Sequence, residues 1–169
     1  MDFNLQPDHL ANNQIVLKPL EANDFEKLFA VASDPLIWEQ HPDSLRYTRP
    51  IFEKYFQSAV ESHSAFLIYD NISKTLMGST RYYDYKPEQS SVAIGYTFIS
   101  RAFWGNTYNK SLKKLMIDYA FQHVDNVVFH VGTNNIRSRK AVEKLGAQLL
   151  SDIEGNVTYN LSKNDWLAR

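Results

Sequence analysis

The chain has 169 residues, of which 44% are hydrophobic and 22% charged, and its formal net charge is −1. This length and mixture predict one globular domain over residues 1–169 with a core of about 14–162, and the near-neutral charge gives no reason to expect nucleic-acid binding. No cysteine is present, which excludes disulfides, thiolate metal sites and cysteine nucleophiles.

The sequence also lacks the patterns of targeting and membrane segments. Met1–Leu10 has neither a basic start nor a long apolar run, so we expect no signal peptide. No stretch approaches the ~18 uninterrupted apolar residues of a membrane span, and a cytoplasmic protein is expected. The five histidines are scattered without paired ligand spacing, so no metal site is expected.

The first part of the chain reads as a strand followed by two helices. Gln14–Leu20 has the composition of a short strand, and Asn23 is a candidate N-cap for a helix that Pro35 ends. Apolar residues at helical spacing after Pro50 indicate a second amphipathic helix. The segment Trp38–Pro50 between the helices is expected to be irregular.

The rest of the chain alternates between β-rich and helical patterns. The expected strands are Phe66–Tyr69, Leu76–Asp84, Ser91–Ile99, Val127–Val131, Ala147–Ile153 and Asn156–Leu161. Helices are expected from Asn109 and over Ile136–Leu145, the second ended by Gly146. The order predicts an α/β (α+β) domain with a central mixed, mostly antiparallel sheet of about six to seven strands, about four helices and one parallel crossover.

Ile94–Lys110 is the first stretch that could form a binding site, because a strand runs through a short polar turn into a helix. The first turn of a helix has free backbone N–H groups and the positive end of the dipole, so it can bind a diphosphate. Side chains that can add hydrogen bonds or charge are Thr107, Asn109, Ser111 and Lys110. The alternative is an ordinary helix that Asn109 caps, with Lys110 and Lys113 solvated.

Val127–Ala147 repeats this strand–turn–helix arrangement. Asn135 can cap the helix while its amide faces a ligand, and Ser138 lies one turn further along the same face. The helix has a basic side, formed by Arg137, Arg139, Lys140 and Lys144, and a core side, formed by Ile136, Ala141, Val142 and Leu145. The alternative interpretation of the charges is a solvated helix face.

Together the two motifs resemble the acetyl-CoA-binding core of the GNAT superfamily, and within it the branch of the ribosomal-protein-alanine N-acetyltransferases. The resemblance is carried by the strand Ile94-Gly95-Tyr96-Thr97-Phe98, the turn Trp104-Gly105 and the helix Asn135–Gly146. It implies a single GNAT-like domain that uses acetyl-CoA as donor. It also implies direct transfer of the acetyl group to a primary amine in a ternary complex.

The resemblance further implies which residues bind the cofactor: Phe98, Ile99, Asn106, Thr107, Tyr108, Asn109, Lys110, Asn135 and Ser138. A backbone N–H near Phe98 and Ile99 would polarise the thioester carbonyl. Ser138 is the catalytic candidate. Because a serine hydroxyl is a poor acid, we expect it to stabilise the leaving thiolate by a hydrogen bond rather than to deliver a full proton.

The sequence departs from the superfamily pattern in two places. The phosphate loop usually reads Gln/Arg-x-x-Gly-x-Gly/Ala, and here the corresponding residues are Trp104, Thr107 and Asn109. Many members carry a tyrosine acid seven residues after the asparagine, where this chain has Val142. These departures leave a catalytically degenerate acyl-CoA-binding or regulatory module as the alternative, and an unrelated α/β binding domain as a third possibility.

Four residues are candidates for contact with the acceptor: Trp38, His41, Tyr82 and Tyr96. His41 is preferred, and core packing is the competing interpretation for each. His130, on an apolar strand, is expected to be a hydrogen-bonded core histidine. The acceptor is a small-molecule amine or a protein N-terminus. An α-amine costs about 1.4 kcal/mol to deprotonate at pH 7 and a lysine about 4.6 kcal/mol, which favours an amine of low pKa. Monomer and homodimer both remain open.

Overall fold

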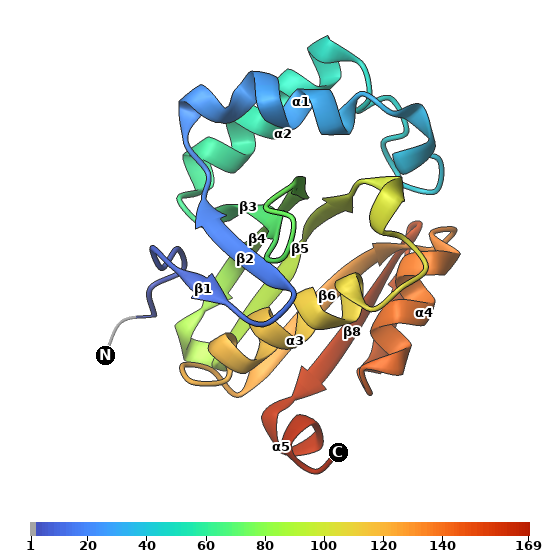
Figure 1. Cartoon of the computed structure of the whole chain (residues 1–169). Coiled ribbons are helices and arrows are strands. Elements are labelled where there is room, and N and C mark those ends of the chain that lie inside the picture. The colour runs from blue at the N-terminus through green and yellow to red at the C-terminus, as the bar shows by residue number, and fades with distance from the viewer. Residues whose placement is uncertain (1–2) are drawn as a thin grey trace.

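The computed structural model describes residues 3–169, which form a mixed eight-stranded sheet with helices on both faces (Figure 1). The strands follow the order β1-β2-β3-β4-β5-β6-β8-β7 across the sheet. Their bounds are β1 Leu10–Ala11, β2 Ile15–Pro19, β3 Ala65–Asp70, β4 Leu76–Lys86, β5 Ser91–Ile99, β6 Asn126–Gly132, β7 Gln148–Ile153 and β8 Asn156–Ser162. The helices are α1 Phe25–Ala32, α2 Arg49–Ser62, α3 Tyr108–Ala120, α4 Ile136–Lys144 and α5 Lys163–Leu167.

This architecture confirms the predicted α/β fold. The β5–β6 pair is parallel and the other neighbours are antiparallel, as one crossover requires. The sequence patterns missed β1 and α5, because two and five residues are too short to show a period. Asn23 is not the N-cap that was expected. The Asp24 carboxylate instead accepts a 2.8 Å hydrogen bond from the Glu21 N–H, and a short 3-10 turn precedes α1.

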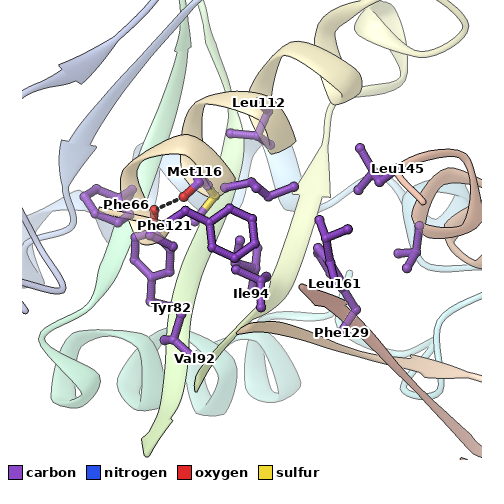
Figure 2. Packing of buried hydrophobic residues seen from close by; sticks show 14 of the residues in the cluster. Phe66, Tyr82, Val92, Ile94, Leu112, Met116, Phe121, Phe129, Leu145 and Leu161 are labelled. Carbon is purple, nitrogen blue, oxygen red and sulfur yellow. Dashed lines mark hydrogen bonds between the residues drawn. The ribbon is translucent and has the colours of Figure 1, made fainter. Parts of the chain in front are cut away.

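Alternation along the strands divides the core between the two faces of the sheet. On β3, Ala65 and Leu67 point to the face that α1 and α2 cover, whereas Phe66 and Ile68 point to the face that α3 covers. Figure 2 shows Met116 of α3 against Tyr82, whose hydroxyl donates a 2.6 Å hydrogen bond to the Met116 carbonyl. The helices therefore hold the sheet from both sides.

The sheet opens between its two parallel strands. Residues Ser91–Ala93 of β5 pair with Asn126–Val128 of β6, and the register ends there. Beyond this point β5 bulges at Tyr96, which adopts φ +53°, and β6 pairs along its whole length with β8 instead. The gap lies at the carboxyl ends of both strands, from which the chain continues into α3 and α4 (Figure 1).

Within residues 3–169, no helix combines the length and the apolar character that crossing a bilayer requires.

Candidate active site

A cavity of about 700 Å³ occupies the gap between β5 and β6. On one side it is lined by the segments that begin α3 and α4. On the other side it is lined by residues of the opposite sheet face and of the loop after α1, among them His41, Arg46, Tyr83 and His130. Because both faces of the sheet contribute, the cavity runs through the sheet.

The loop before α3 presents backbone N–H groups to this cavity. Among residues 3–169, no protein group accepts a hydrogen bond from the amides of Gly105, Asn106, Thr107, Asn109 and Lys110. The Tyr108 amide is already engaged, since it donates to Asn106 Oδ1 at 3.2 Å. The N-cap is Thr107 and not Asn109, so the expected alternative of a helix capped by Asn109 is wrong.

Thr107 lines the cavity, and its hydroxyl accepts a 2.7 Å hydrogen bond from Gln14 Nε2, next to β2. Trp104 also lines the cavity, and its Nε1 donates to the Ile99 carbonyl at 2.8 Å. The free amides thus remain available to a bound anion.

At the start of α4, Asn135 caps the helix as predicted. Its Oδ1 accepts from the Ser138 N–H at 3.4 Å, and its side chain is buried. Ser138, three residues later, also lines the cavity and is half-buried. The two residues therefore lie together, as the sequence suggested.

The expected basic side of α4 is divided in the structure. Lys140 and Lys144 line the cavity, whereas Arg139 donates to the Tyr159 hydroxyl at 3.2 Å and to the Thr133 carbonyl at 3.0 Å. Ile136, which was expected on the core side, is 49% exposed. Helical spacing cannot separate these positions, because the first turn of α4 projects beyond the sheet.

Arg137 connects three segments at the mouth of the cavity. Its guanidinium lies 3.8 Å from the centroid of the Trp104 ring, and its backbone N–H donates to Gln40 Oε1 at 3.3 Å. The loop after α1 also approaches β6, since a Cβ on Gly132 would lie 2.9 Å from Pro42 Cγ. These contacts fix the loop that carries His41 beside the end of β6.

The alternative interpretation of an ordinary capped helix placed Lys113 in solvent, and this is wrong. Only 7% of the residue is exposed, and its Nζ donates to Thr97 Oγ1 at 3.0 Å in the wall of the cavity. Burial lowers the pKa of this amine to about 8. Helical spacing offers a signal for its position, because Met116 and Ile117, three and four residues later, are core residues on the same face.

Two of the four expected acceptor residues line the cavity and two do not. His41 and Tyr96 lie in its wall. Trp38 is 1% exposed, donates from Nε1 to the Ala32 carbonyl at 2.8 Å, and packs against His41 with ring centroids 4.9 Å apart. Tyr82 is fully buried with its hydroxyl bonded to α3, so neither side chain can reach an acceptor.

His41 lies in the cavity wall, as an acceptor contact requires, whereas His130 is not where the sequence suggested. Burial, together with the positive charges of Arg46 and Arg137, lowers the pKa of His41 to about 4, so the imidazole is neutral at pH 7. His130 is exposed and not in the core, because β6 is covered on its other face only; its Nδ1 lies 3.0 Å from Thr158 Oγ1.

The expected cofactor residues are brought together with one exception. Those that line the cavity are Phe98, Ile99, Asn106, Thr107, Asn109, Lys110, Asn135 and Ser138. The Tyr108 side chain lies elsewhere, with its hydroxyl 3.2 Å from Asp70 Oδ1 and its ring against Phe103. Sequence reasoning missed the cavity residues Arg46, Tyr83 and Lys113, whose positions depend on how distant segments pack. In the described part of the chain, no three His, Asp or Glu side chains are grouped to hold a metal ion.

Comparison with known proteins identifies the fold and the family. The family model of the acetyltransferase (GNAT) domain matches residues 14–148. A GCN5-related N-acetyltransferase from Brucella melitensis superposes with a TM-score of 0.79 and 19% identity, over 96% of this chain and 84% of that one. A probable GNAT-family acetyltransferase from Chromobacterium violaceum gives 0.78 and 17%, over 95% and 89%.

A spermidine N-acetyltransferase from Vibrio cholerae, solved with CoA and spermine, has a TM-score of 0.68 and 17% identity, over 92% of this chain and 99% of that one. Among curated protein sequences, none matches this chain. At these identities the likeness to solved structures establishes the fold, and it does not confirm the ribosomal-protein-alanine branch.

Proposed function

We propose, from the premise that this chain belongs to the GNAT acetyltransferase family, that it transfers acetyl from acetyl-CoA directly to a primary amine. The observation that carries the proposal is the cavity that runs through the sheet with unpaired amides at one end. Such a passage lets a donor and an acceptor approach from opposite faces. The motifs quoted above favour the ribosomal-protein-alanine branch within the family.

The start of α3 fits the diphosphate of the donor. The free amides between Gly105 and Lys110 and the dipole of a 13-residue helix favour an anion there. Lys110, Lys140 and Lys144 add positive charge around the same cavity. The Thr107–Gln14 hydrogen bond ties this loop to the segment before β2.

The bulged half of β5 fits the extended arm of the donor. Beyond Ala93, polar backbone groups of β5 that point toward β6 have no strand partner on that side, because the β5–β6 register ends there. An amide-bearing chain in the gap would satisfy them. A backbone N–H in this segment would polarise the thioester carbonyl, which is the oxyanion-hole role.

Two side chains can stabilise the charge that the leaving sulfur acquires. Acetyl-CoA supplies the acetyl group and a thiol leaving group. The Ser138 hydroxyl donates a hydrogen bond to that sulfur, and the Lys113 ammonium in the opposite wall favours negative charge in the same cavity. Val142 also lines the cavity and has no proton to offer, so no tyrosine acid acts from that position.

The acceptor enters from the face that carries His41 and Tyr96. With a pKa of about 4, His41 is too weak a base to hold a proton from an ammonium group, so it binds the neutral amine by a hydrogen bond. Water in the cavity then carries the proton away. A small-molecule amine or a protein N-terminus of low pKa meets this requirement at the lowest cost.

Calorimetry with acetyl-CoA, followed by thiol release across a panel of amines, tests the proposal. We expect saturable binding of acetyl-CoA and amine-dependent release of CoA thiol. The absence of binding at millimolar acetyl-CoA would overturn the proposal. Binding without turnover of any amine would favour the catalytically degenerate module, which no specific observation favours at present.

A further inference from the structure

Arg81 on β4 is a buried cation without an anionic partner. Only 3% of the residue is exposed. Its Nη1 donates to Ser58 Oγ at 2.9 Å and its Nη2 to the Tyr55 carbonyl at 3.4 Å, both on α2. Its Nε has no hydrogen-bond partner, and no carboxylate within residues 3–169 forms an ion pair with it.

Neutral groups compensate this charge only in part. The guanidinium lies 3.7 Å from the centroid of the Tyr96 ring and 5.4 Å from that of Tyr55, which are favourable cation–π distances. Burial nevertheless lowers the pKa of Arg81, and the charge of Arg46 lowers it further. Buried charges are ordinarily paired, so an unpaired one beside a cavity indicates that the partner comes from outside the protein.

A second pocket, of about 260 Å³, lies against this cation between α2 and the β4–β5 pair. Besides Arg81, its wall contains the cationic side chains of Arg46 and Lys54. Asp43 is the one acid in the wall; its carboxylate is 47% exposed and lies 4.0 Å from Arg46 Nε. Three cations therefore face a single, largely solvated carboxylate. We call this the arginine pocket.

The arginine pocket adjoins the main cavity, because Arg46 and Tyr96 line both. It lies on the sheet face from which the acceptor enters. One acceptor molecule can therefore place a group in the arginine pocket and its amine in the gap between β5 and β6, provided that it is long enough to pass Tyr96.

We propose that the arginine pocket binds a carboxylate of the acceptor, so that the acceptors are amines that carry a carboxylate on the same molecule. This inference rests on the proposed function and specifies its substrate class. A carboxylate offers two oxygens to the cations that face the pocket, and it supplies the counter-charge that Arg81 lacks. A polyamine would instead bring positive charge toward three cations.

Matched acceptors test the carboxylate. Each pair has the same chain and differs by one group: glycine against glycinamide, and 4-aminobutyrate or 5-aminopentanoate against the diamine of equal length. The dipeptides Ala-Glu and Ala-Gln, both amidated at the C-terminus, test whether the carboxylate can come from a peptide side chain. We expect kcat/KM to be at least tenfold higher for the carboxylate member of one or more pairs. A wild-type enzyme that prefers the amides or the diamines would overturn the proposal.

Arg81→Gln should remove this preference by raising KM for the carboxylate member, with less than a twofold change for its neutral partner. The ratio within a pair cancels differences in amine reactivity. Arg46→Gln serves the same purpose if Arg81→Gln does not fold, and Arg81→Lys should restore part of the preference. Lys163→Gln removes a cation outside both pockets and is the matched control. An equal loss for both members of a pair would show that Arg81 only joins β4 to α2.

Product binding separates this inference from the proposed function. The N-acetyl products of each pair, from N-acetylglycine to 5-acetamidopentanoate and their neutral or diamine counterparts, are titrated into wild type and Arg81→Gln by calorimetry, which requires no turnover. If no amine is acetylated, the proposed function fails. The arginine pocket is still supported if the carboxylate product binds more tightly than the neutral one and Arg81→Gln abolishes this difference. Equal binding of both products would contradict it.

Discussion

The two sides of the cavity are built from different parts of the polypeptide. On the α3–α4 side, recognition groups are mainly backbone amides of the loop that ends at Lys110. On the α1–α2 side they are side chains, with Arg81 held between Tyr55 and Tyr96. A site made of amides depends on the path of the chain, whereas a site made of side chains depends on the identity of each residue.

This difference explains why Thr107 can replace a glycine of the family pattern. The threonine hydroxyl accepts a hydrogen bond from Gln14, while within residues 3–169 no protein group accepts one from its amide. No comparable replacement exists for Arg81, because its guanidinium spans Ser58 and Tyr55 at once. We therefore expect the donor side to tolerate neutral substitutions and the acceptor side to respond to single ones.

Lys113 is the exception on the donor side, and its removal should have the largest effect. The pKa of about 8 in the folded protein lies below the 10.5 of a free lysine side chain, so the unfolded chain binds more protons between these pH values and the free energy of unfolding rises across that window. Below pH 8 the folded protein bears the full free-energy cost of burying the charged ammonium. The free energy of unfolding of Lys113→Met should therefore exceed that of wild type by up to about 3 kcal/mol at pH 7, and this difference should vanish near pH 10.5.

Urea unfolding at pH 7, 8, 9 and 10 measures this effect. Lys114→Met is the control, because Lys114 is exposed and pairs with Asp118 on the surface. A Lys113→Met protein that is less stable than wild type at pH 7 would show that the Thr97 hydrogen bond outweighs the burial of the charge.

The amide-lined side should be sensitive to charge and insensitive to neutral change. Asn109→Asp places a negative charge among the free amides, and we expect it to weaken CoA binding by about 2 kcal/mol, or roughly thirtyfold. Asn109→Ala should change affinity by less than threefold. Asn164→Asp, the same substitution on exposed α5, is the matched control. Unaltered calorimetric affinity in Asn109→Asp would move the diphosphate away from this loop.

Ser138 tests whether a side chain on the donor side takes part in the chemistry. Ser138→Ala should lower kcat about tenfold, equivalent to about 1.4 kcal/mol, since one hydrogen bond to the leaving sulfur is lost. The dissociation constant of acetyl-CoA should stay within twofold of wild type, because the Asn135 cap uses the Ser138 backbone and not its hydroxyl. An unchanged kcat removes Ser138 from the mechanism.

The smallest effect is expected from His41, which should not change the pH dependence of the reaction. Because its pKa is lowered to about 4, it stays neutral across the range in which a free histidine titrates. Profiles of kcat/KM for wild type and His41→Gln should therefore run parallel from pH 6 to 8. An inflection near 6.5 in wild type that disappears in His41→Gln would show an ionising His41 at the acceptor.

Local patterns predicted most of the elements, and the family resemblance supplied the residues proposed for the donor. The two strand–turn–helix motifs are continuous in sequence, so the Asn135 cap and the loop before α3 could be placed from spacing alone. The residues on the acceptor side could not be placed from spacing. Alternation showed that Tyr82 and His130 lie on strands, but which face is covered depends on distant helices, and the two residues were misassigned in opposite directions.

Buried cations were the other limit of the sequence. Lysine and arginine are ordinarily exposed, so residue type gives no reason to bury Lys113 or Arg81, and only the helical spacing of Lys113 from Met116 and Ile117 indicates a buried position. Both become buried only when α3 packs on β5 and α2 packs on β4. The residues that distinguish this chain's site are thus the ones that require the assembled fold.

The early end of the β5–β6 register divides the sheet into two parts. Strands β1–β5 and strands β6–β8 are joined by three residue pairs at one end of the boundary between β5 and β6. At the open end, the Trp104–Arg137 stack and the approach of Pro42 to Gly132 are contacts between the two parts. A molecule that enters the gap therefore contacts both parts of the sheet, and the cavity that it fills also borders the loop that carries His41.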